Sequence, residues 1–210
     1  MSVLDDLLTR PRFGEGLQNY SCYWAALRDA RLTTLRDLDT GYPAHPDHSR
    51  SWLGSAGYLA WLDLVGTAFT RTDQPAPSSI TAIEKGIERF APHVDPPDRR
   101  ALYALRCSLL HDNSLANSRA DPALCHLFAL TPDTGAPLVV HPAQKWDGSY
   151  PVVPAGGNVS DVTTVVSLYA LGELAESIHR SIVSLHAAKV LALDLSEDEA
   201  AVRYMASSYL

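Results

Sequence analysis

Arg106 and His111 are the two side chains of this sequence whose types and spacing best suit chemistry on a phosphate. Histidine transfers protons near neutral pH, and the planar guanidinium of arginine binds phosphate oxygens. Cleavage of RNA without a metal needs a base, an acid and a cation that stabilises the phosphorane. His111 is the candidate base or acid, and Arg106 is the candidate cation. The candidate supporting residues are Asp63, Ser108, Asp112 and Asn113.

The segment that carries this pair is predicted to be a helix. Pro96 and Pro97 before Asp98 indicate its start, and residues 112–114 indicate its end. At about 100° per residue, one apolar stripe is typical of a side that faces the core. It consists of Ala101, Leu102, Leu105 and Leu109.

A second apolar strip lies roughly opposite the first and consists of Tyr103, Cys107 and Leu110. Arg106 and His111 flank this strip, about 140° apart on an ideal helix. A helix that is apolar on two faces is usually buried between its own core and something else. We expect a second copy of the chain to cover the second strip, which predicts a homodimer with two arginines and two histidines at its two-fold interface.

The stretch Leu-Arg-Cys-Ser-Leu-Leu-His-Asp, in a helical context, resembles the motif of the HEPN superfamily. The resemblance implies a dimeric α-helical protein with Arg106 and His111 in the active site. Many members of that superfamily are metal-independent RNases of toxin and antiviral systems. The resemblance therefore implies an endoribonuclease of single-stranded RNA, with an antitoxin or another protein as a candidate partner. Cys107 departs from the pattern, because active members commonly carry a polar residue directly after the arginine.

Two alternatives stay open at this point. The alternative function is a non-catalytic α-helical dimer that binds RNA or a protein partner. For Asp63, which lies in the apolar run of residues 52–69, the simpler interpretation is an exposed edge or a capping contact. The functional interpretation makes its carboxylate an acidic partner for Arg106 or His111.

Composition limits the classes of function. The 210 residues suit a single domain over 1–210, and 46% hydrophobic residues are ample for its core. A net charge of −7 argues against broad electrostatic binding of nucleic acid, so a local patch would have to hold RNA. Away from the first predicted helices, the only dense basic stretch is Arg99, Arg100, Arg106 and Arg119, and Asp98, Asp112 and Asp121 dilute it. Neither a membrane span nor a secretion signal is expected, which makes the cytoplasm the default location.

No cofactor or metal site is predicted. Three cysteines without paired spacing suggest reduced thiols rather than a disulfide framework or a zinc site. His45 and His48 flank Asp47 in a proline-rich loop without nearby further ligands. His179 and His186 are seven residues apart on one predicted helix face. A metal-dependent enzyme that uses these four histidines is a third interpretation, which bound metal in the purified protein would reveal.

The predicted fold is mainly α, a HEPN-like helical bundle with a small β-hairpin insertion before a long C-terminal helix. Periodicity predicts helices over residues 21–38, 51–71, 80–91, 98–111 and 161–193, and a short one that starts at Ser196. The insertion spans about 122–154. Its two apolar runs within 122–142 are separated by a turn, which predicts two antiparallel strands.

Overall fold

The computed structural model describes residues 2–8, 19–43, 52–118, 121–150 and 157–207. Most of the described chain is helical, so the prediction of a mainly α fold is confirmed. The α-helices are α1 (Val3–Leu8), α2 (Cys22–Thr33), α3 (Trp52–Ala68), α4 (Ala82–Phe90), α5 (Pro96–Cys107), α6 (Leu168–Ala187) and α7 (Glu197–Tyr204). The strands are β1 (Asn19–Ser21), β2 (Phe69–Arg71), β3 (Ala116–Asn117), β4 (His126–Thr131), β5 (Val139–Val140), β6 (Thr163–Ser167), β7 (Leu191–Leu193) and β8 (Met205–Ser207).

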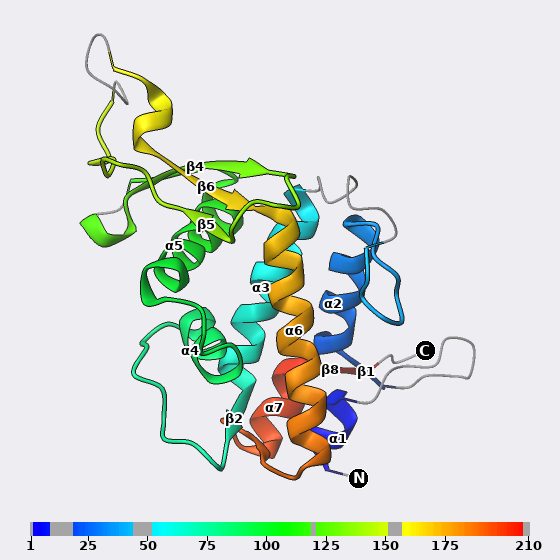
Figure 1. Cartoon of the computed structure of the whole chain (residues 1–210). Coiled ribbons are helices and arrows are strands. Elements are labelled where there is room, and N and C mark those ends of the chain that lie inside the picture. The colour runs from blue at the N-terminus through cyan, green and yellow to red at the C-terminus, as the bar shows by residue number, and fades with distance from the viewer. Residues whose placement is uncertain (1, 9–18, 44–51, 119–120, 151–156, 208–210) are drawn as a thin grey trace.

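Helix α3 forms the centre of the bundle, with α2, α4 and α6 packed around it (Figure 1). It is apolar on nearly every face, as a helix surrounded by others must be. Helices α3 and α4 approach closely at Gly66 and Gly86, because a Cβ atom on Gly66 would collide with the carbonyl oxygen of Ala82. This contact fixes how α3 lies in the bundle, and α3 carries Asp63.

A four-stranded sheet with the order β3-β4-β6-β5 lies across one end of the bundle (Figure 1). Strands β4 and β6 are parallel, with Leu127 opposite Thr163, whereas β5 and β6 are antiparallel, with Val139 opposite Val166. The predicted hairpin is therefore wrong. Its two runs are strands of opposite direction, but β6, from later in the sequence, lies between them. Residues 151–154 of the predicted insertion lie outside the described residues.

The long C-terminal helix starts later than predicted. Residues 163–167 form β6, and α6 begins at Leu168, where the Ser167 hydroxyl accepts a hydrogen bond from the Ala170 N–H at 3.2 Å. The predicted N-cap, Asp161, lies instead in a 3₁₀ turn, Val159–Val162. The run Val-Thr-Thr-Val-Val explains the difference, because β-branched residues favour an extended backbone.

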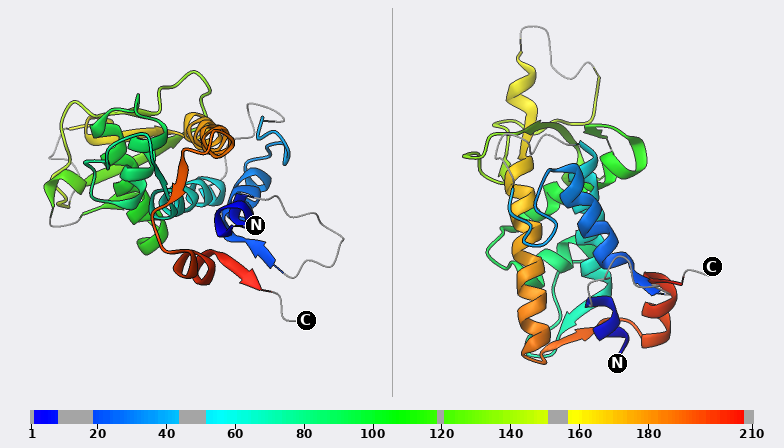
Figure 2. Two further views of the ribbon diagram at one scale, coloured as in Figure 1. Left: turned by 90° about the horizontal axis from the view of Figure 1, so that it is seen from below. Right: turned by 90° about the vertical axis from the view of Figure 1, so that its right-hand side faces the viewer.

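Two small antiparallel strand pairs, β2–β7 and β1–β8, lie toward the end of the bundle opposite the four-stranded sheet (Figures 1 and 2). The N-terminal helix α1 and the C-terminal helix α7 lie at that same end. Within the described ranges, no helix combines the length and the apolar composition needed to cross a membrane.

A buried ion pair joins α2 to α6. The Arg31 guanidinium donates from Nε and Nη2 to the two carboxylate oxygens of Glu176, at 2.9 and 2.7 Å, and both side chains are 1% exposed. The Tyr58 hydroxyl donates to Glu176 at 3.2 Å, and Arg31 Nη1 donates to the Leu38 carbonyl at 2.8 Å. These partners compensate the desolvation of both charges.

Candidate functional site

The helix of the predicted motif changes type before it ends. Helix α5 stops at Cys107 and continues as a π-helical turn, Ser108–Asp112. Asn113 ends this turn with a left-handed backbone (φ 47°), and its N–H donates to the Ser108 carbonyl, so the predicted end of the helix is confirmed. In a π-helix the backbone bonds join residues five apart. His111 is consequently brought over Arg106, although an α-helix would hold the two about 140° apart.

Arg106 lies between the other two side chains of the cluster. Its Nη1 lies 2.7 Å from His111 Nε2, and its Nη2 donates to Asp63 Oδ2 on α3 at 2.8 Å. The Arg106 and Asp63 side chains are 21% and 27% exposed, and His111 is exposed. The structure therefore places Asp63 as an acidic partner of Arg106 rather than as an unpaired carboxylate at an edge.

The Arg106–His111 contact fixes the form of the imidazole that takes part in it. Arginine carries only hydrogen-bond donors, so Nε2 of His111 must accept, which requires a neutral ring with its proton on Nδ1. A neutral Nε2 is also what a general base needs. A phosphate oxygen that replaced Nε2 on the guanidinium would leave Nε2 free to accept a proton, while Asp63 kept Arg106 in position.

No protein-family model, curated protein or solved structure matches this chain. The geometry of its side chains is therefore what bears on its function.

The remaining predicted supporting residues do not join the cluster. Ser108 is fully buried, and its hydroxyl donates to the Ala104 carbonyl at 3.2 Å, so its role is in the helix backbone. Asp112 and Asn113 are exposed beside His111. Among the hydrogen bonds of the described residues, none joins the side chain of Asp112 or Asn113 to Arg106 or His111.

The two apolar strips of the motif helix differ in the structure. The first stripe, Ala101, Leu102, Leu105 and Leu109, is buried, as predicted. The second is already covered in part by the same chain, because Cys107 is buried and Tyr103 packs against the core. Only Leu110, which is 40% exposed, presents substantial apolar surface next to His111. A partner surface centred on this strip is therefore smaller than the sequence suggests.

The described arginines of the predicted basic patch lie beside acidic side chains. Arg99 lies 3.0 Å from Glu88, and Arg100 lies 3.4 Å from Glu84. Arg106 is paired with Asp63, as described above, and Arg119 lies outside the described residues. An RNA phosphate at this helix would meet arginines that already have carboxylates beside them.

The histidines of the metal interpretation are not brought together by the described structure. His45, Asp47 and His48 lie outside the described residues. His179 is buried and shares a 2.6 Å hydrogen bond with the Tyr23 hydroxyl, whereas His186 pairs with Asp5 at 3.2 Å. In the described part of the chain, no three histidine, cysteine or acidic side chains lie close enough to hold a metal. The three cysteines are free thiols.

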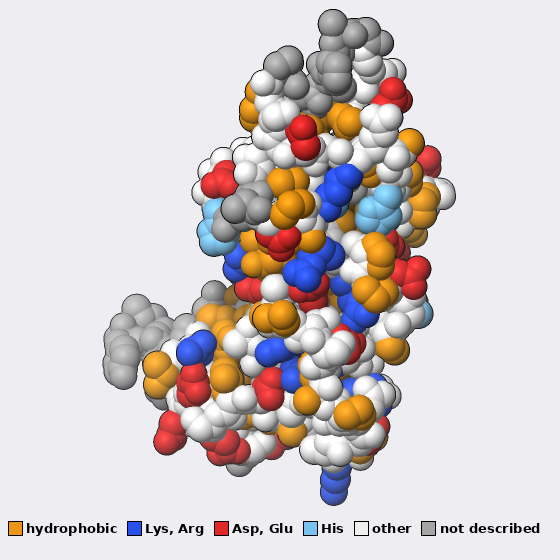
Figure 3. All heavy atoms as spheres, turned by 90° about the vertical axis from the view of Figure 1, so that its left-hand side faces the viewer, with side chains coloured by type: hydrophobic (Ala, Val, Ile, Leu, Met, Phe, Trp, Pro, Cys, Tyr) orange, Lys and Arg blue, Asp and Glu red, His pale blue; other side chains and the backbone are white. Residues whose placement is uncertain are grey.

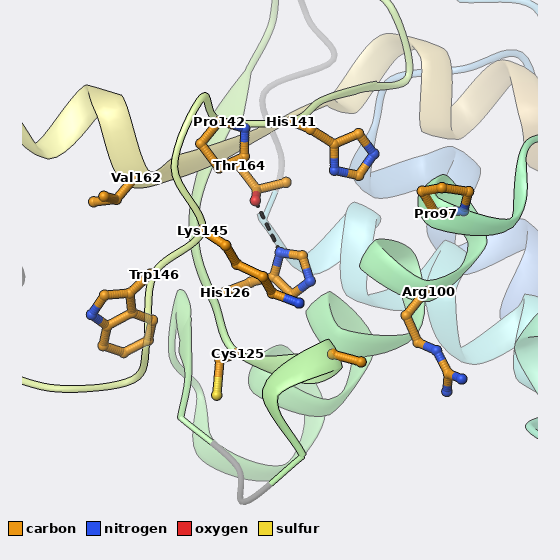
Figure 4. Close-up of a pocket in the computed structure, with 11 residues that line it drawn as sticks. Pro97, Arg100, Cys125, His126, His141, Pro142, Lys145, Trp146, Val162 and Thr164 are labelled. Atoms are coloured by element: carbon orange, nitrogen blue, oxygen red, sulfur yellow. Dashed lines mark hydrogen bonds between the residues drawn. The ribbon is translucent and has the colours of Figure 1, made fainter.

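A pocket of about 350 Å³ is the feature that the sequence did not predict (Figure 4). Its lining comes from four separate segments: the first turn of α5, the start of β4, the loop after β5, and the start of β6. Its polar side chains include Arg100, His126, His141 and Lys145. No spacing in the sequence links these segments, because only the pairing of β6 with β4 and β5 brings them together.

Figure 3 shows arginine, lysine and histidine side chains interspersed with hydrophobic and acidic ones on one face of the molecule.

Proposed function

We propose that this protein is a metal-independent endoribonuclease of the HEPN type, with Arg106 and His111 as its catalytic residues. The observation that carries the proposal is the 2.7 Å contact between Arg106 and an exposed His111, on a π-helical turn that aligns residues five apart. π-Helical turns inside α-helices occur frequently at functional sites. The resemblance of the motif supplies the reaction class, and a toxin or antiviral system in the cytoplasm is the setting that it implies.

The proposed reaction divides its two proton transfers between two copies of His111. In one copy the neutral Nε2 takes the proton of the RNA 2′-hydroxyl, whose oxygen then attacks the adjacent phosphorus. In the other copy a protonated His111 gives its proton to the 5′-oxygen that leaves. The guanidinium of Arg106 stabilises the charged phosphorane, and the products are a 2′,3′-cyclic phosphate and a 5′-hydroxyl.

The test of this proposal is cleavage of single-stranded RNA by purified protein in the presence of a chelator. We expect a 2′,3′-cyclic phosphate product. His111→Ala and Arg106→Ala should each lower the rate by about 10²- to 10⁴-fold, the usual cost of losing a general acid or base, with the circular dichroism spectrum unchanged. His186→Ala serves as the matched control, since His186 pairs with Asp5 elsewhere, and should cleave at the wild-type rate. Equal residual cleavage by all four proteins would identify a contaminating nuclease and refute the proposal.

The dimer that the proposal needs has a separate test. Sedimentation at micromolar concentration should report two chains, and Leu110→Glu should yield monomers, because it places a charge on the exposed apolar side chain beside His111. Val202→Glu is the control, since Val202 is a more exposed apolar residue on α7, and it should remain dimeric. A wild-type monomer would remove the composite site and with it the division of proton transfers.

The second candidate function is a non-catalytic helical dimer that binds RNA or a protein partner, such as an antitoxin. The observation that favours it is that Nη1 and Nη2 of Arg106 are already engaged by His111 and Asp63. Under this alternative, RNA or the partner protein binds without being cut. Binding would then survive His111→Ala unchanged.

A further inference from the structure

The pocket at the first turn of α5 has rigid apolar walls. Trp146 is buried, and its indole N–H donates to the Ser149 carbonyl at 2.9 Å, which fixes the ring in place. Pro97, Pro142 and Val162 supply further apolar surface (Figure 4). A volume of about 350 Å³ lies within the range of pockets that enclose small organic ligands. The walls therefore suit a ring of the size of a nucleoside.

The polar lining of this pocket is positive. Arg100 and Lys145 contribute two cations, and His126 and His141 contribute two imidazoles. The described lining contains no carboxylate, although the chain as a whole has a net charge of −7. Two of the lining side chains have acidic partners outside the lining: Asp98 bonds to His141 at 2.8 Å, and Glu84 lies 3.4 Å from Arg100 Nε. A pocket of this charge favours an anion.

His126 is a polar lining residue whose side chain is held in a fixed position. It is buried, stacks on Phe128 with ring centroids 5.1 Å apart, and shares a 2.9 Å hydrogen bond with Thr164. Burial, together with the nearby Lys145 and His141, lowers the pKa of His126 to about 4. Figure 4 shows the ammonium group of the exposed Lys145 beside the His126 ring, so this cation lies at the pocket.

We propose that this pocket binds a phosphate ester of mononucleotide size, with Lys145 at the phosphate and the apolar walls around Trp146 against the ring. Charge-assisted hydrogen bonds from an ammonium group are strong ligands for phosphate. The shared chemistry is that of a nucleotide phosphate, which either a free mononucleotide or one nucleotide of a single-stranded RNA supplies.

The proposed pocket is distinct from the Arg106–His111 site. The two share no residue, and Arg100 precedes Arg106 by six residues, about 9 Å along the helix axis. Ligand binding in the pocket can therefore be measured without reference to RNA cleavage. His111→Ala should bind the ligand as the wild type does, so failure of the nuclease proposal and failure of this one are distinguishable.

Isothermal titration calorimetry with adenosine 5′-monophosphate tests the proposal directly. We expect one site per chain and at least tenfold weaker binding of adenosine, which lacks the phosphate. Lys145→Gln should weaken binding of the monophosphate about tenfold or more, whereas Lys145→Arg should retain it. Lys189→Gln is the matched control, because Lys189 is an exposed lysine that does not line the pocket. Absence of binding at millimolar monophosphate, or equal binding by wild type and Lys145→Gln, would overturn the proposal.

A competition experiment distinguishes the two sources of the phosphate. A short single-stranded RNA that displaces adenosine 5′-monophosphate from the wild type identifies the pocket as part of the RNA path. Retention of the monophosphate in the presence of excess RNA identifies a free mononucleotide as the ligand. Both results support the phosphate site, and the calorimetric titrations above decide whether it exists.

Discussion

Two of the protein's arginine–carboxylate pairs have almost the same length but lie in different surroundings. Arg31 and Glu176 meet at 2.7 Å inside the bundle, and Arg106 and Asp63 meet at 2.8 Å near the surface. The remaining donors of Arg31 include one bound to a fixed backbone carbonyl, whereas the remaining Nη of Arg106 is bound to the titratable ring of His111. The comparison shows that the Arg31 pair is enclosed by buried partners, whereas the Arg106 pair lies beside an exposed side chain, His111.

The largest effect should come from breaking the buried pair. Glu176→Gln leaves the Arg31 charge buried without its counter-charge, and we expect the free energy of unfolding to fall by about 3–5 kcal/mol. Urea unfolding followed by circular dichroism measures this change. Glu199→Gln is the control, because Glu199 pairs with Arg203 on the exposed side of α7 and should cost at most about 0.5 kcal/mol. Equal stabilities of the two variants would show that the buried pair does not hold α2 to α6.

A smaller effect should appear when the pH is lowered, and it should come from the buried region. Burial, reinforced by Arg31, lowers the pKa of His179 to about 4. The pKa of His126 is also lowered to about 4, again mainly by burial. Unfolded histidine titrates near pH 6.5, so between about pH 6.5 and 4 the unfolded chain binds more protons than the folded chain. The free energy of unfolding is therefore highest above pH 6.5 and falls as the pH falls.

Each of these two histidines should contribute about 2 kcal/mol to the loss of stability between pH 7 and pH 5. Urea titrations at both pH values measure the loss. His179→Gln, which keeps a polar side chain near Tyr23, should be less sensitive to pH by the contribution of one histidine. An unchanged pH dependence in this variant would show that His179 is not a neutral, buried group.

The smallest effect should come from the surface pair, and it should appear in kinetics rather than in stability. Asp63→Ala frees Arg106 from its positioning partner, and we expect kcat for RNA cleavage to fall about tenfold. Asp63→Asn retains an oxygen acceptor for Nη2 but removes a negative charge beside the phosphate, so KM should fall a few-fold with kcat nearly unchanged. Both variants should unfold within about 1 kcal/mol of the wild type. A large loss of stability with unchanged kinetics would make Asp63 a structural residue.

The parts of the molecule that depend on nearby residues could be predicted from the sequence. The start of α5 at Pro96, its buried stripe and the end of the following π-helical turn at Asn113 all follow from local rules of capping and periodicity. The prediction of a hairpin is wrong because β4 and β5 each pair with β6 instead of with one another, and β6 begins more than twenty residues after β5. The valines from 162 onward fit a helical period, but their β-branched neighbours Thr163 and Thr164 form a strand.

Some features of the candidate site could likewise be predicted from nearby residues, and others could not. Arg106 and His111 could be found because they lie five positions apart on a predicted helix, and Asp63 stands out as an unusual carboxylate in an apolar helix. The π-helical turn has no signal in its sequence, and the direct contact that it creates between Arg106 and His111 could not be anticipated. The pocket around Trp146 could not be predicted either, because its cations meet only after the sheet has formed.

The π-helical turn also affects how many residues the chain can place between Arg106 and His111. An α-helix stacks residues four apart, and a π-helix stacks residues five apart. Deletion of one residue within Ser108–Leu110 would permit this turn to return to α-helical bonding while the histidine still faces the arginine. The separation of the two side chains in sequence and the type of helix between them can therefore change together, with the spatial pair preserved. A search for proteins with this chemistry should accordingly allow either spacing, provided that the local helix type matches it.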